Sequence, residues 1–403
     1  MERAESCIGG GRRSGMHIAI AIQALGTLGG KERDALAIAG GLAARGNRVT
    51  IVTRSAGLQV PSGVVVRRTG TDGWTNHGRA RFFARAVAAA RSADEFDALL
   101  SFDKLRDADA YYAADACFAC LDRGLKAWLP RYATYARLEA DCFSAGGPDI
   151  LFLCGKQEDE YRRQYNLAAD RAVVLPPMIH HPDRQRFYER RTAVRQQFGI
   201  PASATLAASV GIYPKQKGVD RTIAVLHDVP GLYLLAVGLK DAASVRAMAA
   251  KNGVDARARL VGHSDEVIDI LGAADLMLHP ARLENTGLVI LESLLAGVPV
   301  IASAVCGFAE YIERFGAGIV LPDPFNAADY VAAIRAAIEP DMLAELKRRA
   351  RDSAPELRAE GGLERILDLI EATLARRRQW EATSTARWLW WVGLVEVAAL
   401  PGC

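Results

Sequence analysis

The chain has few aromatic residues and almost no net charge. Aromatic side chains make up 7% of its 403 residues, and 50 basic residues are nearly balanced by 47 acidic ones, which leaves a formal net charge of +3. A charge this small gives no support for nucleic-acid binding by bulk electrostatics, so no nucleic-acid partner is expected. Half of the residues are hydrophobic and 24% are charged. This balance excludes a disordered chain and is typical of a soluble α/β protein.

Cysteine is also scarce. The seven cysteines are scattered, odd in number and not preceded by a secretory leader. This pattern favours a reducing, cytoplasmic setting. Cys117 and Cys120 have zinc-ligand spacing, but no second such pair or histidine pair follows at a suitable distance. We expect buried thiols, with no metal and no other cofactor.

Long hydrophobic runs are missing from most of the chain. Residues 1–15 are predicted to be a flexible lead-in. The apolar, tryptophan-rich tail at 381–403 contains Glu396 and is short for a membrane span of about 20 residues. It could instead add a contact at a membrane surface.

Short apolar runs alternate with helical patterns from Met16 onward. Strand-like runs lie at 17–22, 48–53, 64–68, 97–102, 149–154 and 172–176, and again at 205–211, 233–238, 258–262, 275–281 and 299–303. Helical patterns separate several of them, notably 31–46 and 78–92. This alternation predicts an α/β fold with parallel sheets covered by helices on both faces.

The alternation of strand-like and helical patterns begins again after a proline-rich stretch that contains Pro176 and Pro177. This repetition predicts two doubly wound domains with a ligand cleft between them. The predicted boundaries are a lead-in at 1–15, Rossmann-like domains at 16–178 and 179–360, a helix at 361–380 that packs back across the domains, and a tail at 381–403.

Two loops could bind anions. Gly26, Gly29 and Gly30 lie between the first strand and a helix, where backbone amides could receive a phosphate, although a plain tight turn is the alternative. In the second half, Lys215 and Lys217 precede a helix and could neutralise a diphosphate, or could be ordinary exposed lysines.

Residues 281–300 place Glu284 in a loop after a strand and Glu292 inside the following helix. Chance alone supplies about five acidic pairs at this spacing, so the spacing is weak evidence. Glu292 is expected roughly 7–8 Å along the helix axis from its start, too far for the two carboxylates to share a proton or a metal easily. They suit two ends of one elongated polar ligand, such as a sugar nucleotide.

These features together resemble the retaining family 4 glycosyltransferases of GT-B fold, and more closely those that add glucose to the lipopolysaccharide core. The resemblance runs from Met16 to about Arg378. The segments that carry it are 26–46, 75–84, 107–119, 131–143, 217–223, 273–281 and 303–312.

The resemblance implies a role for each matched position. Gly29 and Gly30 would lie against the donor diphosphate, Lys217 would neutralise it with help from Lys215, and Glu284 would contact the transferred sugar. Glu292 would hold the ribose. The amides near Thr286 to Leu288, with neighbouring Asn285 and Gly287, would bind sugar and phosphate. Asp34 and Asp109 would face the cleft, for acceptor binding or charge stabilisation.

One departure from the family pattern concerns the residue before Lys217. Family members usually carry arginine there, whereas this chain has Gln216, and a lysine cannot reproduce the forked contact of a guanidinium. Asp107 and Asp109 also form an Asp-x-Asp pattern that marks metal sites in the other glycosyltransferase fold, but two repeated halves argue against that fold.

The stretch 123–138 is basic and contains no acidic residue. Arg123, Lys126, Arg131 and Arg137 are interleaved with Trp128, Tyr132 and Tyr135. Such a mixture suits an anionic bilayer surface. The alternative is that these aromatic side chains simply belong to the hydrophobic core.

The expected protein is a cytoplasmic enzyme, peripheral on the inner membrane, that moves glucose from UDP-glucose to a heptose of lipid-linked lipopolysaccharide core with retention. A family 4 enzyme with another hexose donor or glycan acceptor is the first alternative. A catalytically silent membrane scaffold is the second.

Overall fold

The computed structural model describes residues 15–26, 29–70, 73–93, 95–121, 124, 128–179, 184–264 and 266–398, and side chains within these ranges except 184–188, 381–382 and 384–398. Most of the predicted lead-in, together with Arg123 and Lys126, lies outside the described residues. The chain divides into two compact units. The first comprises 1–151, 162–173 and 366–403, and the second comprises 152–161 and 174–365.

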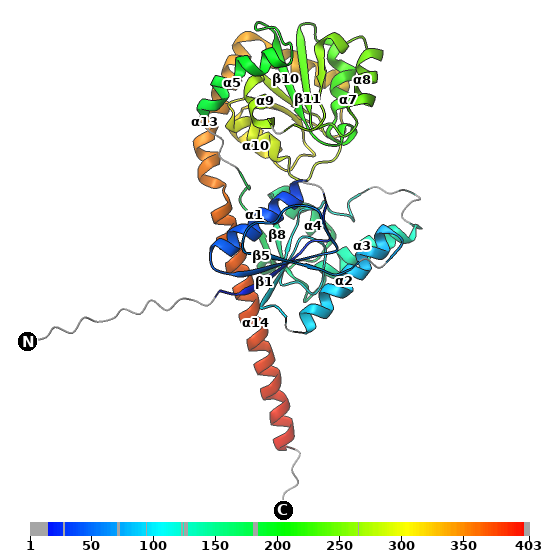
Figure 1. Ribbon diagram of the computed structural model, residues 1–403, viewed down its shortest axis with the longest axis vertical. Coiled ribbons are helices and arrows are strands. Elements are labelled where there is room, and N and C mark those ends of the chain that lie inside the picture. Colours follow the sequence, from blue (N-terminus) through cyan, green and yellow to red (C-terminus); the bar gives the residue numbers. More distant parts are fainter. Residues whose placement is uncertain are drawn as a thin grey trace, which may run out of the picture. The chain divides into compact units, whose positions relative to one another are not determined.

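The first unit is built on a seven-stranded sheet in the order β5-β3-β1-β6-β7-β8-β9 (Figure 1). Its strands are β1 (His17–Ala21), β3 (Arg48–Thr53), β5 (Val64–Arg68), β6 (Ala98–Ser101), β7 (Ala110–Tyr112), β8 (Asp149–Phe152) and β9 (Ala172–Val174). Its helices are α1 (Gly30–Ala44), α2 (Asn76–Ser92), α3 (Pro130–Phe143) and most of α14 (Leu363–Ala398), whereas α4 (Gly155–Gln164) lies mainly in the second unit and only its end, from Arg162, belongs to the first. The pairings from β5 to β8 are parallel.

The second unit is built on a six-stranded, fully parallel sheet in the order β12-β11-β10-β13-β14-β15. Its strands are β10 (Thr205–Val210), β11 (Leu232–Val237), β12 (Ala258–Leu260), β13 (Leu276–His279), β14 (Val300–Ser303) and β15 (Gly318–Leu321). Its helices are α5 (Arg184–Gln197), α6 (Pro214–Lys217), α7 (Val219–Val225), α8 (Ala242–Lys251), α9 (Val267–Ala273), α10 (Leu288–Leu295), α11 (Ala309–Phe315), α12 (Ala327–Ile338) and α13 (Pro340–Glu360).

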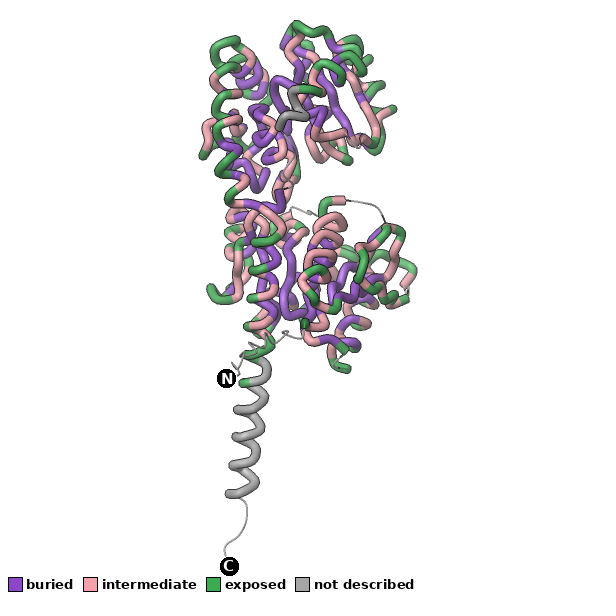
Figure 2. The backbone as a smooth tube through the Cα atoms, turned by 60° about the vertical axis from the view of Figure 1, so that its left-hand side comes forward, coloured by how far each residue is buried: buried purple, intermediate pink, exposed green. Residues whose placement is uncertain are grey.

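Hydrophobic burial explains why the central strands lack the polar alternation of a half-exposed strand. In β1, Ile18 to Ala21 are all fully buried, as are all four residues of β6 and β14 apart from a trace of exposure at Ser303. Figure 2 shows the buried strands inside each unit, with exposed residues on the surrounding helices. Strands covered on both faces become continuous apolar runs, so the two parallel sheets confirm the predicted α/β class.

The helix α14 packs on the first unit from Ile366 onward. Arg45, directly after α1, donates to Asp368 at 2.8 Å and to Glu371 at 2.9 Å. A Cβ on Gly41 would lie 2.5 Å from Leu367, so the glycine permits this close approach. The helix begins within the predicted 361–380 segment and its backbone continues to Ala398, into the predicted tail. No helix among the described residues is long and apolar enough to cross a membrane.

Candidate functional site

A charged cluster lies at the carboxyl edge of the second sheet, where ligands bind in open α/β sheets. Glu284 follows β13 and accepts a hydrogen bond from Lys217 Nζ at 2.5 Å. Its same oxygen, Oε2, lies 3.0 Å from His279 Nε2. His279 is the last residue of β13 and is fully buried. The structure therefore brings the predicted Glu284 and Lys217 together and adds His279, which the sequence analysis missed.

The surroundings of Glu284 keep it ionised. Burial by itself would raise the pKa of this carboxyl, but the hydrogen bond with His279 and the ammonium of Lys217 lower its pKa to about 2. A buried carboxylate is stable only when it is paired in this way. At neutral pH the group is thus a hydrogen-bond acceptor and a negative charge, and not a proton donor.

Two glycines allow the loop that carries Lys217 to approach the strands. A Cβ on Gly218, whose φ is +78°, would lie 2.0 Å from the carbonyl oxygen of Pro280. A Cβ on Gly211 would lie 2.5 Å from the Lys217 side chain. Both positions need the absence of a side chain so that the lysine stem can pack along the strand ends.

Residues 285–288 form a supported turn at the start of α10. The Phe308 N–H donates to Thr286 O at 2.7 Å, and Gln157 Nε2 donates to Asn285 Oδ1 at 3.0 Å. Gly287 precedes the helix at a φ of +83°. The helix starts at Leu288, which places Glu292 five residues in, as the sequence predicted. Free amides at such a start can receive an anion.

Lys215 and Gln216 occupy different positions from Lys217. The side chain of Lys215 is exposed, and its carbonyl oxygen accepts a hydrogen bond from Arg282. Gln216 Nε2 donates to Leu283 O at 3.3 Å, so the glutamine contacts the loop that leads to Glu284. The contact of Lys215 with a diphosphate stays a prediction.

In the first unit, Gly29 and Gly30 lie at the start of α1. The N–H of Gly29 donates to Glu32 Oε2 at 3.1 Å, so a side chain of the same helix already accepts this amide proton. Nothing lies within 4 Å of a Cβ built on Gly30. The predicted contact of these glycines with a donor diphosphate stays a prediction.

Asp34 lies on α1 beneath Tyr112, whose hydroxyl donates to Asp34 Oδ2 at 3.0 Å. Burial raises the pKa of Asp34 to about 6, against the lowering effects of Arg33 and Tyr112. Perturbed carboxyl groups of this kind are candidates for proton handling near neutral pH. Tyr112, the partner of Asp34, is the last residue of β7. The predicted role of Asp34 beside the acceptor stays a prediction.

Asp109 does not fit its predicted role. It precedes β7, at the amino end of the sheet, and only 3% of it is exposed. Arg91 donates to its Oδ1 at 2.8 Å, and the Leu99 N–H donates to its Oδ2 at 2.6 Å. Ligands bind at the opposite edge of a parallel sheet. The correction is that Asp109 joins α2 to the strands and does not face a ligand.

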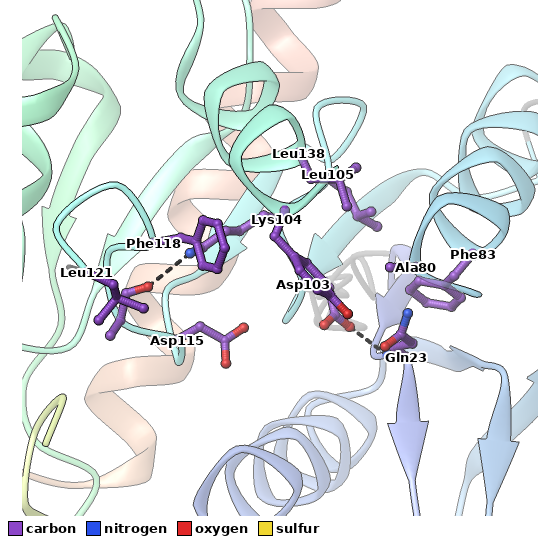
Figure 3. Close-up of a pocket in the computed structure, with 12 residues that line it drawn as sticks. Gln23, Ala80, Phe83, Asp103, Lys104, Leu105, Asp115, Phe118, Leu121 and Leu138 are labelled. Atoms are coloured by element: carbon purple, nitrogen blue, oxygen red, sulfur yellow. Dashed lines mark hydrogen bonds between the residues drawn. The ribbon is translucent and has the colours of Figure 1, made fainter. Parts of the chain in front are cut away.

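A pocket of about 350 Å³ opens at the carboxyl edge of the first sheet (Figure 3). Gln23, Asp103 and Asp115 follow β1, β6 and β7 in turn and form its polar side. The apolar side is formed mainly by α2, α3 and the intervening loops, through Ala80, Phe83, Leu105, Phe118, Leu121, Tyr135 and Leu138. Apolar walls with a few polar groups are typical of a small-molecule site.

Lys31 joins the two carboxylates of this pocket. Its Nζ lies 2.8 Å from Asp103 Oδ1 and 3.0 Å from Asp115 Oδ2. Burial would raise the pKa of Asp115, but Lys31 and Lys104 lower it below its ordinary value. The sequence analysis missed these three residues. The position of Asp103 and Asp115 just beyond the ends of parallel strands was the signal that could have found the two carboxylates, whereas Lys31 lies in the first turn of α1.

The loop that carries Phe118 is held by Glu139 of α3. This fully buried carboxylate accepts hydrogen bonds from the Phe118 N–H at 2.6 Å and the Ala119 N–H at 2.8 Å. Tyr165 Oη donates to it at 2.8 Å, and Lys104 forms an ion pair with it. These bonds fix the pocket wall in place.

The described cysteines are free thiols. Cys117, Cys142, Cys154 and Cys306 are buried, as expected, whereas Cys120 is exposed. No group of three metal-ligating side chains occurs among the described residues.

The basic stretch divides into exposed and packed side chains. Trp128 is 89% exposed, and the side chains of Arg131 and Arg137 are exposed. By contrast, Tyr132 stacks on Phe118 with ring centroids 6.0 Å apart, and Tyr135 lines the pocket. The two tyrosines therefore face Phe118 and the pocket, whereas Trp128, Arg131 and Arg137 are exposed among the described residues of this stretch.

Three comparisons relate the chain to known proteins. A family model described as glycosyl transferases group 1 matches residues 190–356. The chain is 33% identical over 361 residues to the lipopolysaccharide glucosyltransferase WaaG of Escherichia coli K12, covering 83% of this chain and 96% of that protein. It is 28% identical over 241 residues to a D-inositol 3-phosphate glycosyltransferase of Saccharomonospora viridis, covering 55% of each.

Among solved structures, WaaG, described as a glycosyltransferase involved in lipopolysaccharide biosynthesis, superposes with a TM-score of 0.80 at 31% identity. The match covers 88% of this chain and 99% of that one. The two Rossmann-like units accordingly have the GT-B fold. With this extent of similarity, the chain belongs to the group 1 glycosyltransferases, family 4.

Proposed function

We propose that this protein is a retaining glucosyltransferase that moves glucose from UDP-glucose to a heptose of the lipopolysaccharide inner core. The observation that carries the proposal is the cluster of Glu284, Lys217 and His279 at the carboxyl edge of the second sheet. The extended similarity to WaaG, a lipopolysaccharide glucosyltransferase, supports glucose as the transferred sugar and lipopolysaccharide as the acceptor class.

On the donor side, Lys217 supplies positive charge for the diphosphate, and Glu284 accepts hydrogen bonds from the hydroxyls of the transferred glucose. The amides of residues 286–288 and the side chain of Asn285 complete the contacts to sugar and phosphate, and Glu292 holds the ribose. Charges fixed in advance stabilise the developing negative charge without reorganisation. No metal ion is part of the proposal.

In the proposed reaction, the bond between the anomeric carbon and the UDP oxygen breaks, and its electron pair leaves with UDP. The acceptor hydroxyl oxygen forms the new bond to that carbon and gives up its proton to a phosphate oxygen of the departing UDP. Because Glu284 stays ionised, it stabilises the positive charge that develops on the sugar and does not protonate the leaving group.

On the acceptor side, we assign the heptose to the pocket beside Asp103 and Asp115. Carboxylates bind sugar hydroxyls, and Phe118 and Tyr135 offer apolar surface to the C–H faces of a pyranose ring. Asp34 lies at the same end of the sheet and contributes charge there.

The acceptor is lipid-linked in this proposal, so the enzyme works on the cytoplasmic face of the inner membrane. Trp128, Arg131 and Arg137 are the exposed residues assigned to the anionic bilayer surface. The predicted Arg123 and Lys126 lie outside the described residues.

Mass spectrometry of the lipopolysaccharide core, with and without the gene for this chain, tests the proposal. We expect a difference of one hexose on an inner-core heptose. A different added sugar would move the protein to the first alternative, a family 4 enzyme with another donor or acceptor. An unchanged core, with no turnover of any nucleotide sugar in a donor panel, would favour the catalytically silent scaffold.

A further inference from the structure

A second concave surface lies between α2 and α3, directly beside the acceptor pocket. It is a groove of about 560 Å³. Its walls are formed by Arg81, Ala84 and Arg85 of α2 and by Ala133, Arg137 and Asp141 of α3, among others. We call it the arginine groove.

The arginine groove adjoins the acceptor pocket through one side chain. Leu138 lines both cavities, and both sets of walls include residues of α2 and α3 that interleave along the same turns. Ala80 and Phe83 of α2 point to the pocket side, whereas Arg81 and Arg85 line the groove. A ligand that fills the pocket can therefore extend into the groove past Leu138.

The charges of the groove favour an anion. The groove is lined by three arginines and one carboxylate, Asp141. Oδ2 of Asp141 lies 3.7 Å from Nε of Arg137. Arg81 and Arg85 are exposed, and neither side chain forms an ion pair within the described part of the chain. The small side chains of Ala84 and Ala133 leave room between the helices. Guanidinium groups on both walls of a narrow groove match the geometry of phosphate oxygens.

We propose that the arginine groove binds a phosphate group carried by the saccharide acceptor. This inference rests on the proposed function, because it extends the acceptor site assigned above. A concave groove next to the sugar pocket suits one compact anion on a glycan better than the broad surface of a bilayer, so in this inference Arg137 contacts the glycan phosphate instead of the bilayer. The acceptor would thus be recognised at two points, its sugar ring in the pocket and its phosphate in the groove.

The test uses the full-length protein and a deacylated core oligosaccharide, which is water-soluble and removes the membrane from the measurement. The acceptor is prepared with its phosphates and after phosphatase treatment. Isothermal titration calorimetry measures binding of each form, and a transfer assay with UDP-glucose measures kcat and KM. The variants are Arg81→Gln/Arg85→Gln and the charge-conserving Arg85→Lys. Arg48→Gln, an exposed arginine at the amino end of β3, is the matched control.

We expect the double variant to weaken binding of the phosphorylated acceptor about 10- to 100-fold, as loss of two charge-assisted hydrogen bonds implies. Binding of the dephosphorylated acceptor, KM for UDP-glucose and kcat should stay at the level of the unmodified protein. Arg85→Lys should recover part of the affinity, and Arg48→Gln should change nothing.

Equal binding of the two acceptor forms by the unmodified protein would overturn the inference, as would an equal effect of the double variant on both forms. Unchanged binding of the soluble acceptor, together with lost binding to vesicles of anionic phospholipid, would reassign the groove to the membrane. If no transfer occurs but the double variant still weakens binding of the phosphorylated form selectively, then the proposed function fails while the groove assignment stands.

Discussion

The two carboxyl-edge sites of this molecule differ in how their charges are arranged. In the second unit, Glu284 is paired with Lys217 and His279 in a compact polar cluster. In the first unit, Asp103, Asp115 and Lys31 form one side of a pocket whose other side is apolar. The difference suits the two halves of a group transfer. A charged, fixed site stabilises a leaving diphosphate, and an amphipathic pocket positions a neutral sugar.

This comparison predicts separable kinetic effects. Changes in the charged cluster should lower kcat, because that cluster is assigned to the transition state. Changes in the pocket should raise KM for the acceptor and leave KM for the donor unchanged. The predictions below run from the largest expected effect to the smallest.

Replacing Glu284 with glutamine should have the largest effect. Glu284→Gln keeps the shape of the side chain but removes the negative charge, so kcat should fall about 10³-fold. Steady-state assays with the nucleotide sugar measure the loss. Circular dichroism tests whether the variant is folded, because the change leaves Lys217 and His279 without their carboxylate partner. A kcat within a few-fold of the unmodified enzyme would remove Glu284 from the reaction.

Replacing Lys217 with methionine should lower kcat about 10²-fold, since one ammonium group near a leaving diphosphate is lost. Lys217→Arg should retain more activity than Lys217→Met. Lys215→Met is the matched comparison, because the Lys215 side chain is exposed and, within the described part of the chain, it is the backbone carbonyl of Lys215 that accepts a hydrogen bond. If Lys215→Met proves as damaging as Lys217→Met, the cluster around Glu284 is not the main source of positive charge.

Filling the acceptor pocket should have a moderate and selective effect. Ala80→Leu adds volume to the α2 wall of the 350 Å³ pocket and should raise KM for the acceptor about 10-fold. The control is Ala89→Leu, at an exposed position of the same helix. An increase in KM for the donor, with no change in KM for the acceptor, would show that the pocket binds the donor and not the acceptor.

Asp34 should produce the smallest effect and a distinct pH signature. With its pKa raised to about 6, loss of its charge should give kcat/KM for the acceptor an acidic limb near pH 6. Asp34→Asn should remove this limb and lower activity several-fold at pH 7.5. Tyr112→Phe removes the hydrogen bond that lowers this pKa, so its limb should move to higher pH. An acidic limb that persists in Asp34→Asn would belong to another group.

The same shift has a consequence for stability. The folded pKa of Asp34 lies above its ordinary value of 3.8, so the folded state binds this proton more tightly than the unfolded chain. The resulting stabilisation is complete below about pH 3.8 and is lost as the pH rises through about 6. Glu284 has the opposite sign, and its contribution is lost as the pH falls from 4.5 towards 2. Thermal unfolding of Asp34→Asn and Glu284→Gln across pH 3 to 8 separates the two.

Much of the fold could be predicted from the apolar pattern. The predicted strands at 48–53 and 64–68 coincide with β3 and β5. The first is a buried parallel strand and reads as a continuous apolar run, and the second is a largely exposed edge strand that its run of β-branched valines still marks. The strands β7 and β15 were not predicted. β7 has only three residues, and β15 begins with a glycine, so neither gives a run long enough to stand out from its neighbours.

The charged cluster was predicted in part for a similar reason. Glu284 and Lys217 lie near strand ends in segments that the sequence marks as loops. His279 has the pattern of an ordinary strand residue, and its contact with Glu284 is visible only in the folded structure. The role of Asp109 was taken from the family resemblance, and because the three-residue strand β7 was not predicted, the sequence did not reveal that Asp109 precedes a strand. Lys31 lies 72 residues from Asp103 and 84 residues from Asp115 in the sequence. A local sequence pattern cannot predict contacts over such separations.

The sequence by itself determined the class of fold, the start of the helix before Glu292 and the identity of the lysine that carries the second-unit charge, because periodicity and loop composition act over a few residues. The tertiary structure decided which carboxylates share a site. It paired Asp109 with Arg91 at the amino edge of the sheet, and it gathered Lys31, Asp103 and Asp115 at the other edge. The reason is strand order, since parallel strands bring their carboxyl ends together however far apart they lie in the chain.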